Sequence, residues 1–169
     1  MRKITLTVLL LSALSFFAQA QEKTFSISGK IELDKGNLLV LTQRPGKIDT
    51  LAKTAIANRQ FSISGTTEEA VVAQLVIEGY AGGFVMILEP GVEYTANLTQ
   101  NGNGDIRGGK LQTAYNEYQK IVVNANAESR ALNKKASEAA AQKHFKTSKE
   151  LQTKANKVQE AAFAKMNNI

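Results

Sequence analysis

The sequence contains no cysteine among its 169 residues. Disulfide bonds, thiol chemistry and thiolate–metal sites are therefore excluded within these residues. Exported proteins often gain stability from disulfides, but here the fold must be stabilised by packing. The chain is long enough for one domain and an appendage, and a domain of this size can bury a real core.

Signals for chemistry are also scarce. The single histidine, His144, has no metal-ligand spacing around it, so we expect it to be exposed or to cap a helix. The glycine-rich segments 79–83 and 102–109 lack the Lys-Ser or Lys-Thr of a phosphate-binding loop. Glu89 and Asp49 lie beside apolar segments, and paired carboxylates can support acid–base chemistry, but nothing in the sequence brings these two together. We therefore expect no catalytic residue, no metal and no cofactor.

Only one long apolar run is present. It spans residues 4–17, follows the positive segment Met1-Arg2-Lys3, and precedes Ala18-Gln19-Ala20. This pattern predicts a signal peptide over residues 1–20 that is cleaved before Gln21, with small residues Ala18 and Ala20 at the two positions a signal peptidase requires. The run is too short to span a bilayer comfortably. We expect a soluble periplasmic or otherwise extracytoplasmic protein with no transmembrane segment after the signal is removed.

The positive charge is unevenly distributed. Residues 21–109 contain eight Lys or Arg against ten Asp or Glu, whereas residues 110–169 contain eleven against five. The basic tail is either a solvated helix face or a surface that attracts an acidic partner or an anionic membrane. No run of alternating aromatic and basic residues appears, and an exported protein rarely meets nucleic acid, so nucleic-acid binding is not expected.

The segment Val71–Leu98 has runs of Val, Ile, Leu, Phe and Met bounded by Gly or Pro. Such runs are typical of buried strands separated by turns at 80–83 and 90–91. They predict three consecutive antiparallel strands at the centre of a sheet. Further strands are expected over 24–33, 38–42, 47–57, 60–65 and 105–107, with a tight turn at Asn58-Arg59.

The pentad F-S-I-S-G at 25–29 recurs at 61–65. This repeat suggests two structurally equivalent strands, each running from an edge into the core. Taken together, residues 21–109 are expected to form a mainly β, antiparallel sandwich-like domain of about seven to eight strands.

Residues 110–169 contain no Gly and no Pro, and their apolar residues recur at spacings of three and four. The pattern predicts helices over about 110–143 and 149–167, with a capping box at Thr147 and Glu150, which pack as a helical hairpin. The second apolar stripe is rich in Ala and buries little area, so the tail should be the least stable part. Packing of helix on sheet explains Tyr115 and Tyr118, and the alternative is an interaction face formed by Tyr115, Tyr118, Val122, Lys134 and Lys135.

The order of these segments resembles a domain of unknown function found at the N-terminus of many bacterial exported thioredoxin-like proteins, the thiol-disulfide oxidoreductase and peroxiredoxin-related family. The resemblance rests on F-S-I-S-G-K-I at 25–31, L-L-V-L-T at 38–42, Ile48-Asp49-Thr50, N-R-Q-F-S-I-S-G at 58–65, F-V-M-I-L-E-P-G-V at 84–92 and I-R-G-G-K-L-Q-T-A-Y-N-E-Y at 106–118. In that family a thioredoxin fold with a Cys-x-x-Cys pair follows. Redox activity therefore transfers to no residue here, and the resemblance implies only the scaffold and an extracytoplasmic location.

Three functional hypotheses follow. The first is a non-catalytic exported binding or interaction module, accessory to thiol-disulfide redox proteins, whose partner is an exported protein such as a thioredoxin-like one. The second is the N-terminal portion of a longer thioredoxin-like oxidoreductase. The third is an envelope-surface or chaperone-like protein that uses the basic helical tail.

Overall fold

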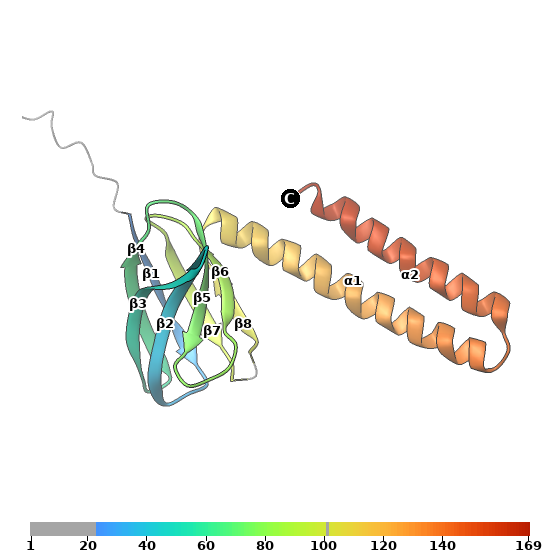
Figure 1. The fold of residues 1–169 in the computed structure, drawn as a ribbon, viewed down its shortest axis with the longest axis horizontal. Helices are drawn as coiled ribbons and strands as arrows, with labels where there is room; N and C mark the ends of the chain where they lie inside the picture. The colour runs from blue at the N-terminus through green and yellow to red at the C-terminus, as the bar shows by residue number, and fades with distance from the viewer. Residues whose placement is uncertain (1–22, 101) are drawn as a thin grey trace, which may run out of the picture. The chain divides into compact units, whose positions relative to one another are not determined.

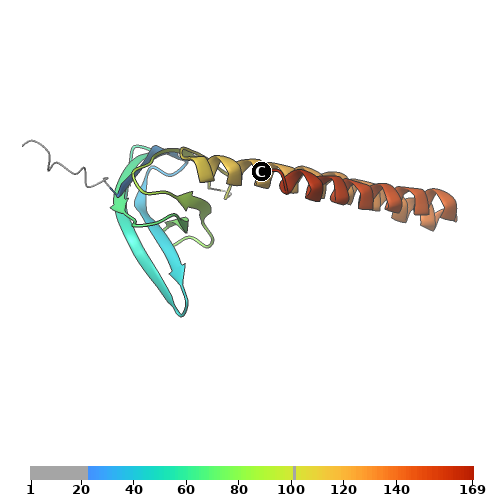
Figure 2. The same ribbon diagram turned by 90° about the horizontal axis from the view of Figure 1, so that it is seen from above.

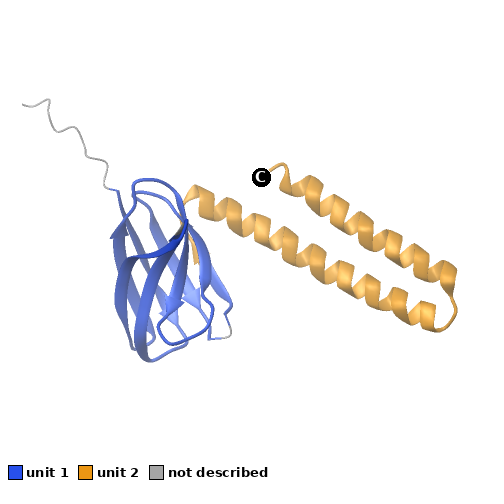
Figure 3. Ribbon diagram, viewed as in Figure 1, with its two compact units in different colours: residues 1–105 blue, residues 106–169 orange. Residues whose placement is uncertain are grey.

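The computed structural model describes residues 23–100 and 102–169. The predicted signal peptide and its cleavage site, with Ala18, Ala20 and Gln21, lie outside the described residues. The chain divides into two compact units, residues 1–105 and 106–169 (Figure 3), which are considered separately below. Among the helices in the described part, none has the length and apolar character needed to cross a bilayer.

The first unit is built on one mixed sheet that curls into a nearly closed barrel (Figure 1, Figure 2). The predicted class, a mainly β domain of about seven to eight strands followed by two helices, is confirmed. The sheet has eight strands, and the two layers expected of a sandwich are parts of this single sheet. Its order is β6-β5-β2-β3-β4-β1-β7-β8. The strands are β1 (Thr24–Ile31), β2 (Lys35–Arg44), β3 (Lys47–Ala57), β4 (Gln60–Thr66), β5 (Val71–Ile77), β6 (Phe84–Leu88), β7 (Glu93–Leu98) and β8 (Gly104–Arg107).

The core is formed by every second residue of these strands, as the two-residue period of a strand requires. Burial alternates most clearly in β4 and β7, where polar and apolar residues also alternate. The largest fully buried side chains of the β region are Tyr94, Phe25, Ile27, Ile31, Leu38, Val40, Leu75, Met86, Leu88 and Leu98.

The prediction of three consecutive antiparallel strands at the centre is wrong for the third strand. β5 and β6 pair antiparallel, but β6 ends the sheet order, and β7 pairs in parallel with β1. The 90–91 turn therefore carries the chain to another part of the sheet instead of closing a hairpin. The Tyr94 hydroxyl fixes this connection, since it accepts a hydrogen bond of 2.7 Å from the backbone N–H of Glu89.

The two F-S-I-S-G segments pair with each other. β1 and β4 run antiparallel with Ile27 opposite Ile63, so Phe25 lies opposite Gly65 and Gly29 opposite Phe61. Each aromatic ring thus faces a residue without a side chain, an arrangement known to rescue glycine in a sheet. The predicted equivalence of the two strands is confirmed by this mirror register. Their predicted position at an edge is wrong, because each has a neighbour on both sides.

The second unit contains α1 (Lys110–Ala141) and α2 (Phe145–Met166), which pack against each other along their length. The side-chain amide of Gln159 donates to the carbonyl of Ala125 at 3.4 Å, which fixes their register. The residues buried between them are small and recur every seven residues on α2 and at spacings of four and seven on α1, as in a coiled coil. They are Ala125, Ser129 and Ala136 on α1 and Ser148, Ala155 and Ala162 on α2.

The predicted start of the second helix is wrong. α2 begins at Phe145 instead of 149, and Thr147 is a helical residue, not a cap. The reversal is made by Lys143, which has a φ of 62°, and His144 occupies the N-cap position without a side-chain cap. The physical reason is packing: Ser148 is buried against α1, so the first turn is stabilised by tertiary contact instead of a capping box.

Candidate functional site

The candidates for acid–base and metal chemistry do not come together. Asp49 lies in β3 and forms an ion pair with Lys47, whereas Glu89 follows β6, and β2 and β5 separate β3 from β6 in the sheet. His144 is exposed between the two helices, where its carbonyl accepts from the Ser148 N–H at 3.0 Å. Among the described residues, no three of His, Asp and Glu gather in a way that could hold a metal ion.

The outer face of strands β3, β2, β5 and β6 has a different character. The inner residues of β2, β5 and β6 alternate with outer residues that are also apolar, so these strands are apolar on both sides. Three of the outer side chains are largely exposed, with relative accessibilities of 66% for Ile48, 62% for Val72 and 43% for Val85. We define the outer apolar face as Leu39, Leu41, Ile48, Val72, Val76, Val85 and Ile87.

The strand register pairs apolar residues on this face. Leu39 lies opposite Val76, and Val72 lies opposite Ile87. Directly opposite residues of neighbouring strands place their Cβ atoms about 5 Å apart, so the side chains of each pair interact. The apolar residues of the face lie on one side of four neighbouring strands. Large exposed apolar patches on a monomer are uncommon away from interaction sites.

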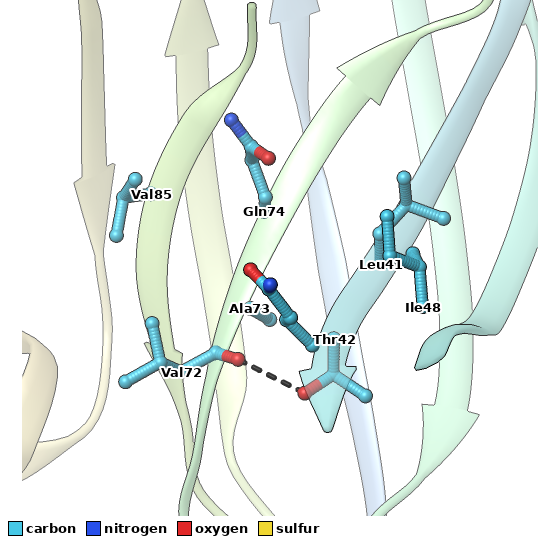
Figure 4. A pocket seen from close by; sticks show the side chains of 8 residues that line it. Leu41, Thr42, Ile48, Val72, Ala73, Gln74 and Val85 are labelled. Carbon is cyan, nitrogen blue, oxygen red and sulfur yellow. Dashed lines mark hydrogen bonds between the residues drawn. The ribbon is translucent and has the colours of Figure 1, made fainter. Parts of the chain in front are cut away.

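Two glutamines interrupt the outer apolar face. Gln43 lies opposite Ile48, and Gln74 lies between Leu41 and Val85 in its row. The two amides and the neighbouring apolar side chains line a shallow depression of about 220 Å³, and Figure 4 shows side chains that line it. The floor is fixed by the buried Thr42 hydroxyl, which donates to the Val72 carbonyl at 3.0 Å. An amide both donates and accepts, so this depression suits an uncharged polar group such as a peptide bond.

Charge at one margin of the face is internally neutralised. The Lys53 ammonium lies 2.8 Å from the Glu78 carboxylate, and the Asn37 amide donates to the same carboxylate at 2.6 Å. The hydrogen bond from Lys53, which has the larger effect, and the one from Asn37 both lower the pKa of Glu78 below its ordinary value of 4.5. Both ionised groups are exposed, so the network contributes little stability. Because Lys53 and Glu78 neutralise each other, they place no unpaired charge beside the outer apolar face.

The predicted interaction face on the first helix is only partly formed. At 100° per residue, Tyr115, Tyr118 and Val122 share one side of α1, whereas Lys134 and Lys135 project from other sides. Tyr118 is 42% accessible, while Tyr115 and Val122 are half-buried. The two lysines also lie at least 12 residues further along, about 18 Å at the rise of an α-helix. The five residues therefore do not make one surface.

The apolar runs that form much of the outer apolar face are visible in the sequence, but they predicted the core of the domain and not an exposed surface. Apolar residues at consecutive positions of V-V-A-Q-L-V-I and F-V-M-I-L predicted buried strands at the centre of a sheet. In the part of the chain that the structure describes, the core lies on the inner side of these strands, and their other side stays accessible.

A family model described as a domain of unknown function, DUF4369, matches residues 25–115. No curated protein matches the chain. The match includes all four strands of the outer apolar face and spans more than half of the chain. The chain belongs to the DUF4369 family of domains of unknown function.

Proposed function

We propose that the chain is a non-catalytic interaction module of the bacterial cell envelope, and that its outer apolar face binds a thioredoxin-fold domain. The observation behind this proposal is the exposure of Ile48, Val72 and Val85, which lie on β3, β5 and β6 on the same outer side of an otherwise normally patterned domain. The function is to hold the thioredoxin-fold partner, which supplies the redox chemistry.

The chemistry of the face favours a protein partner over a charged ligand. Burial of apolar area contributes roughly 25 cal/mol per Å², so covering several branched side chains is a substantial driving force. The neutral margin formed by Lys53 and Glu78 adds no strong field. The amides of Gln43 and Gln74 supply hydrogen bonds that orient a partner in the centre.

The identity of the partner rests on the resemblance described above. In the resembling proteins, a domain of this kind precedes a thioredoxin fold. An uncharged sheet face is a suitable counterpart for a partner that presents an apolar interface core. The predicted signal peptide over residues 1–20 supports an extracytoplasmic setting.

The test uses the chain from Gln21 to Ile169 and a purified exported thioredoxin-fold domain encoded by the same genome. One protein is titrated with the other, and binding is measured by calorimetry. We expect Val72→Asp to weaken binding by at least about tenfold, since a buried charge without a partner costs more than 1.4 kcal/mol. Val123→Asp is the matched control, because Val123 on α1 has nearly the same accessibility, 61% against 62%. Absence of binding, or equal loss in both variants, would refute the proposal.

The DNA downstream of codon 169 separates two forms of the same proposal. An in-frame segment with Cys-x-x-Cys would place the partner in the same polypeptide, and the titration would then use the two parts as separate proteins. Without such a segment, the partner is a separate protein. In both cases the chain from Gln21 to Ile169 should show no insulin-reductase activity alone, and measurable activity would contradict the assignment as non-catalytic.

A further inference from the structure

The end of the helical hairpin combines exposed cations with an exposed aromatic ring. Residues 142–144 connect α1 to α2, and Figure 1 shows this connection at the closed end of the helix pair. Phe145 is the first residue of α2, and its side chain is 69% accessible, the highest value among the exposed large hydrophobic side chains of the described residues. Lys143 and Lys146 flank it in sequence. We define the hairpin tip as Lys143–Lys146 together with Lys149.

The lysines of α1 add to this charge. Lys134 and Lys135 lie six or seven residues before the end of α1, roughly 10 Å along the helix. The tip and these two residues contain five lysines, all exposed, against the two glutamates Glu138 and Glu150 of the same region. None of the five lysines forms an ion pair within the part of the chain that the structure describes. This rise along α1 is comparable to the Debye length of about 10 Å at 0.1 M salt, so salt only partly screens Lys134 and Lys135 from the tip.

Exposed Phe145 between lysines has the pattern of a side chain that enters a membrane interface. An aromatic ring gains free energy in the headgroup region, while a long lysine side chain keeps its ammonium at the level of the phosphates. The lysines and the ring both favour binding only at a surface that has anionic groups on the outside and an apolar layer below them. We propose that the hairpin tip binds the surface of an anionic phospholipid bilayer, with Phe145 inserted among the headgroups.

The geometry favours a bilayer over an acidic protein. A stable protein interface buries about 800 Å² on each partner, and a tip of a few residues at the end of two helices offers much less. Protein interfaces also favour arginine, whose planar fork pairs with carboxylates, and are depleted in lysine. All five cations here are lysines. A diffuse anionic surface needs no such fork, because each lysine near it is attracted individually.

The test uses the chain from Gln21 in sedimentation with vesicles, either of phosphatidylcholine alone or with about one third phosphatidylglycerol. Binding is expected only to the anionic vesicles, and to weaken as salt is raised. Lys143→Gln combined with Lys146→Gln should weaken it roughly 30-fold, at about fivefold for each lysine. Phe145→Ser should weaken it by about tenfold, because the ring no longer enters the interface.

Matched controls come from the same helix. Phe163→Ser removes a ring that is 63% accessible near the other end of α2, and Lys154→Gln with Lys157→Gln removes two exposed charges from its middle. Both variants should bind like the unaltered chain, and all variants should keep the same far-ultraviolet circular dichroism. The proposal is refuted by no binding to anionic vesicles, by equal binding to neutral ones, or by equal losses in the controls. Binding to poly-glutamate but not to vesicles would likewise overturn it in favour of an acidic protein.

Discussion

Replacing Gly29 by alanine tests the closest approach of two strands in the barrel. Gly29 of β1 lies beside Ala96 of β7 in the parallel pair. A Cβ atom at Gly29 would lie 1.8 Å from the Ala96 carbonyl oxygen and 2.7 Å from its carbon. Both are backbone atoms, so no side-chain rotation can relieve the overlap. Ordinary contact begins at 3.4 Å, which requires the strands to separate by about 1.6 Å.

The cost of that separation follows from what it breaks. Hydrogen bonds of the β1–β7 ladder on both sides of Gly29 lengthen, and each contributes about 1 kcal/mol. Phe25 and Ile27, both fully buried on β1, are displaced in a packed core, which costs about 1–3 kcal/mol. The total is about 3–5 kcal/mol, a large fraction of the 5–15 kcal/mol by which domains are usually stable.

The assay is urea unfolding of the chain from Gln21, followed by far-ultraviolet circular dichroism and tyrosine fluorescence. With an m-value of about 2 kcal/mol/M, Gly29→Ala should lower the midpoint by about 2 M. Ser28→Ala, at the neighbouring exposed position, should change stability by less than about 0.5 kcal/mol. A loss below about 1 kcal/mol for Gly29→Ala would show that the strands adjust freely, and would refute the reasoning.

Two further substitutions test the turn and the helix pair. Tyr94→Phe leaves the Glu89 N–H without its acceptor and should cost about 1 kcal/mol near neutral pH. Burial raises the pKa of Tyr94 above its ordinary 10.0, so the folded chain keeps this proton longer than the unfolded one. Stability should therefore fall as pH rises above 10.0, and less steeply in Tyr94→Phe; identical alkaline profiles in urea would contradict this. Ala155→Leu overfills a position that is 1% accessible and should cost about 1–3 kcal/mol, whereas Ala164→Leu on the exposed side should be neutral in thermal unfolding.

Local structure could be predicted from the sequence because its causes are local. Alternation of apolar and polar residues in 24–31 and 60–66 determined which side chains enter the core. Asn58 and Arg59 both adopt positive φ, 52° and 63°, as the predicted two-residue turn requires. The spacing of three and four in 110–169 also predicted that the two helices pack as a hairpin, and Ala125, Ser129 and Ala136 are buried on α1.

Strand pairing could not be predicted, because it depends on residues far apart in the chain. β6 and β7 are consecutive, yet β7 pairs with β1, where Gly29 permits an approach that any side chain would prevent. The start of α2 was misplaced for a similar reason. The capping box at Thr147 and Glu150 is a local signal, and the burial of Ser148 against α1 outweighs it. In each case tertiary packing outweighed a local pattern.

The outer apolar face and the hairpin tip should respond to salt in opposite ways, because different forces act at each. Burial of Val72 and Ile48 depends on apolar area, and salts that are excluded from protein surfaces strengthen such burial. The lysines of the tip act through exposed charges, which salt screens beyond a Debye length that shrinks to about 3 Å at 1 M. Moderate sulfate should thus preserve binding of a thioredoxin-fold domain while releasing the chain from anionic vesicles. If sulfate abolished binding of the thioredoxin-fold domain and of the vesicles together, a single surface would account for both. The separate assignments to Val72 and Phe145 would then fail.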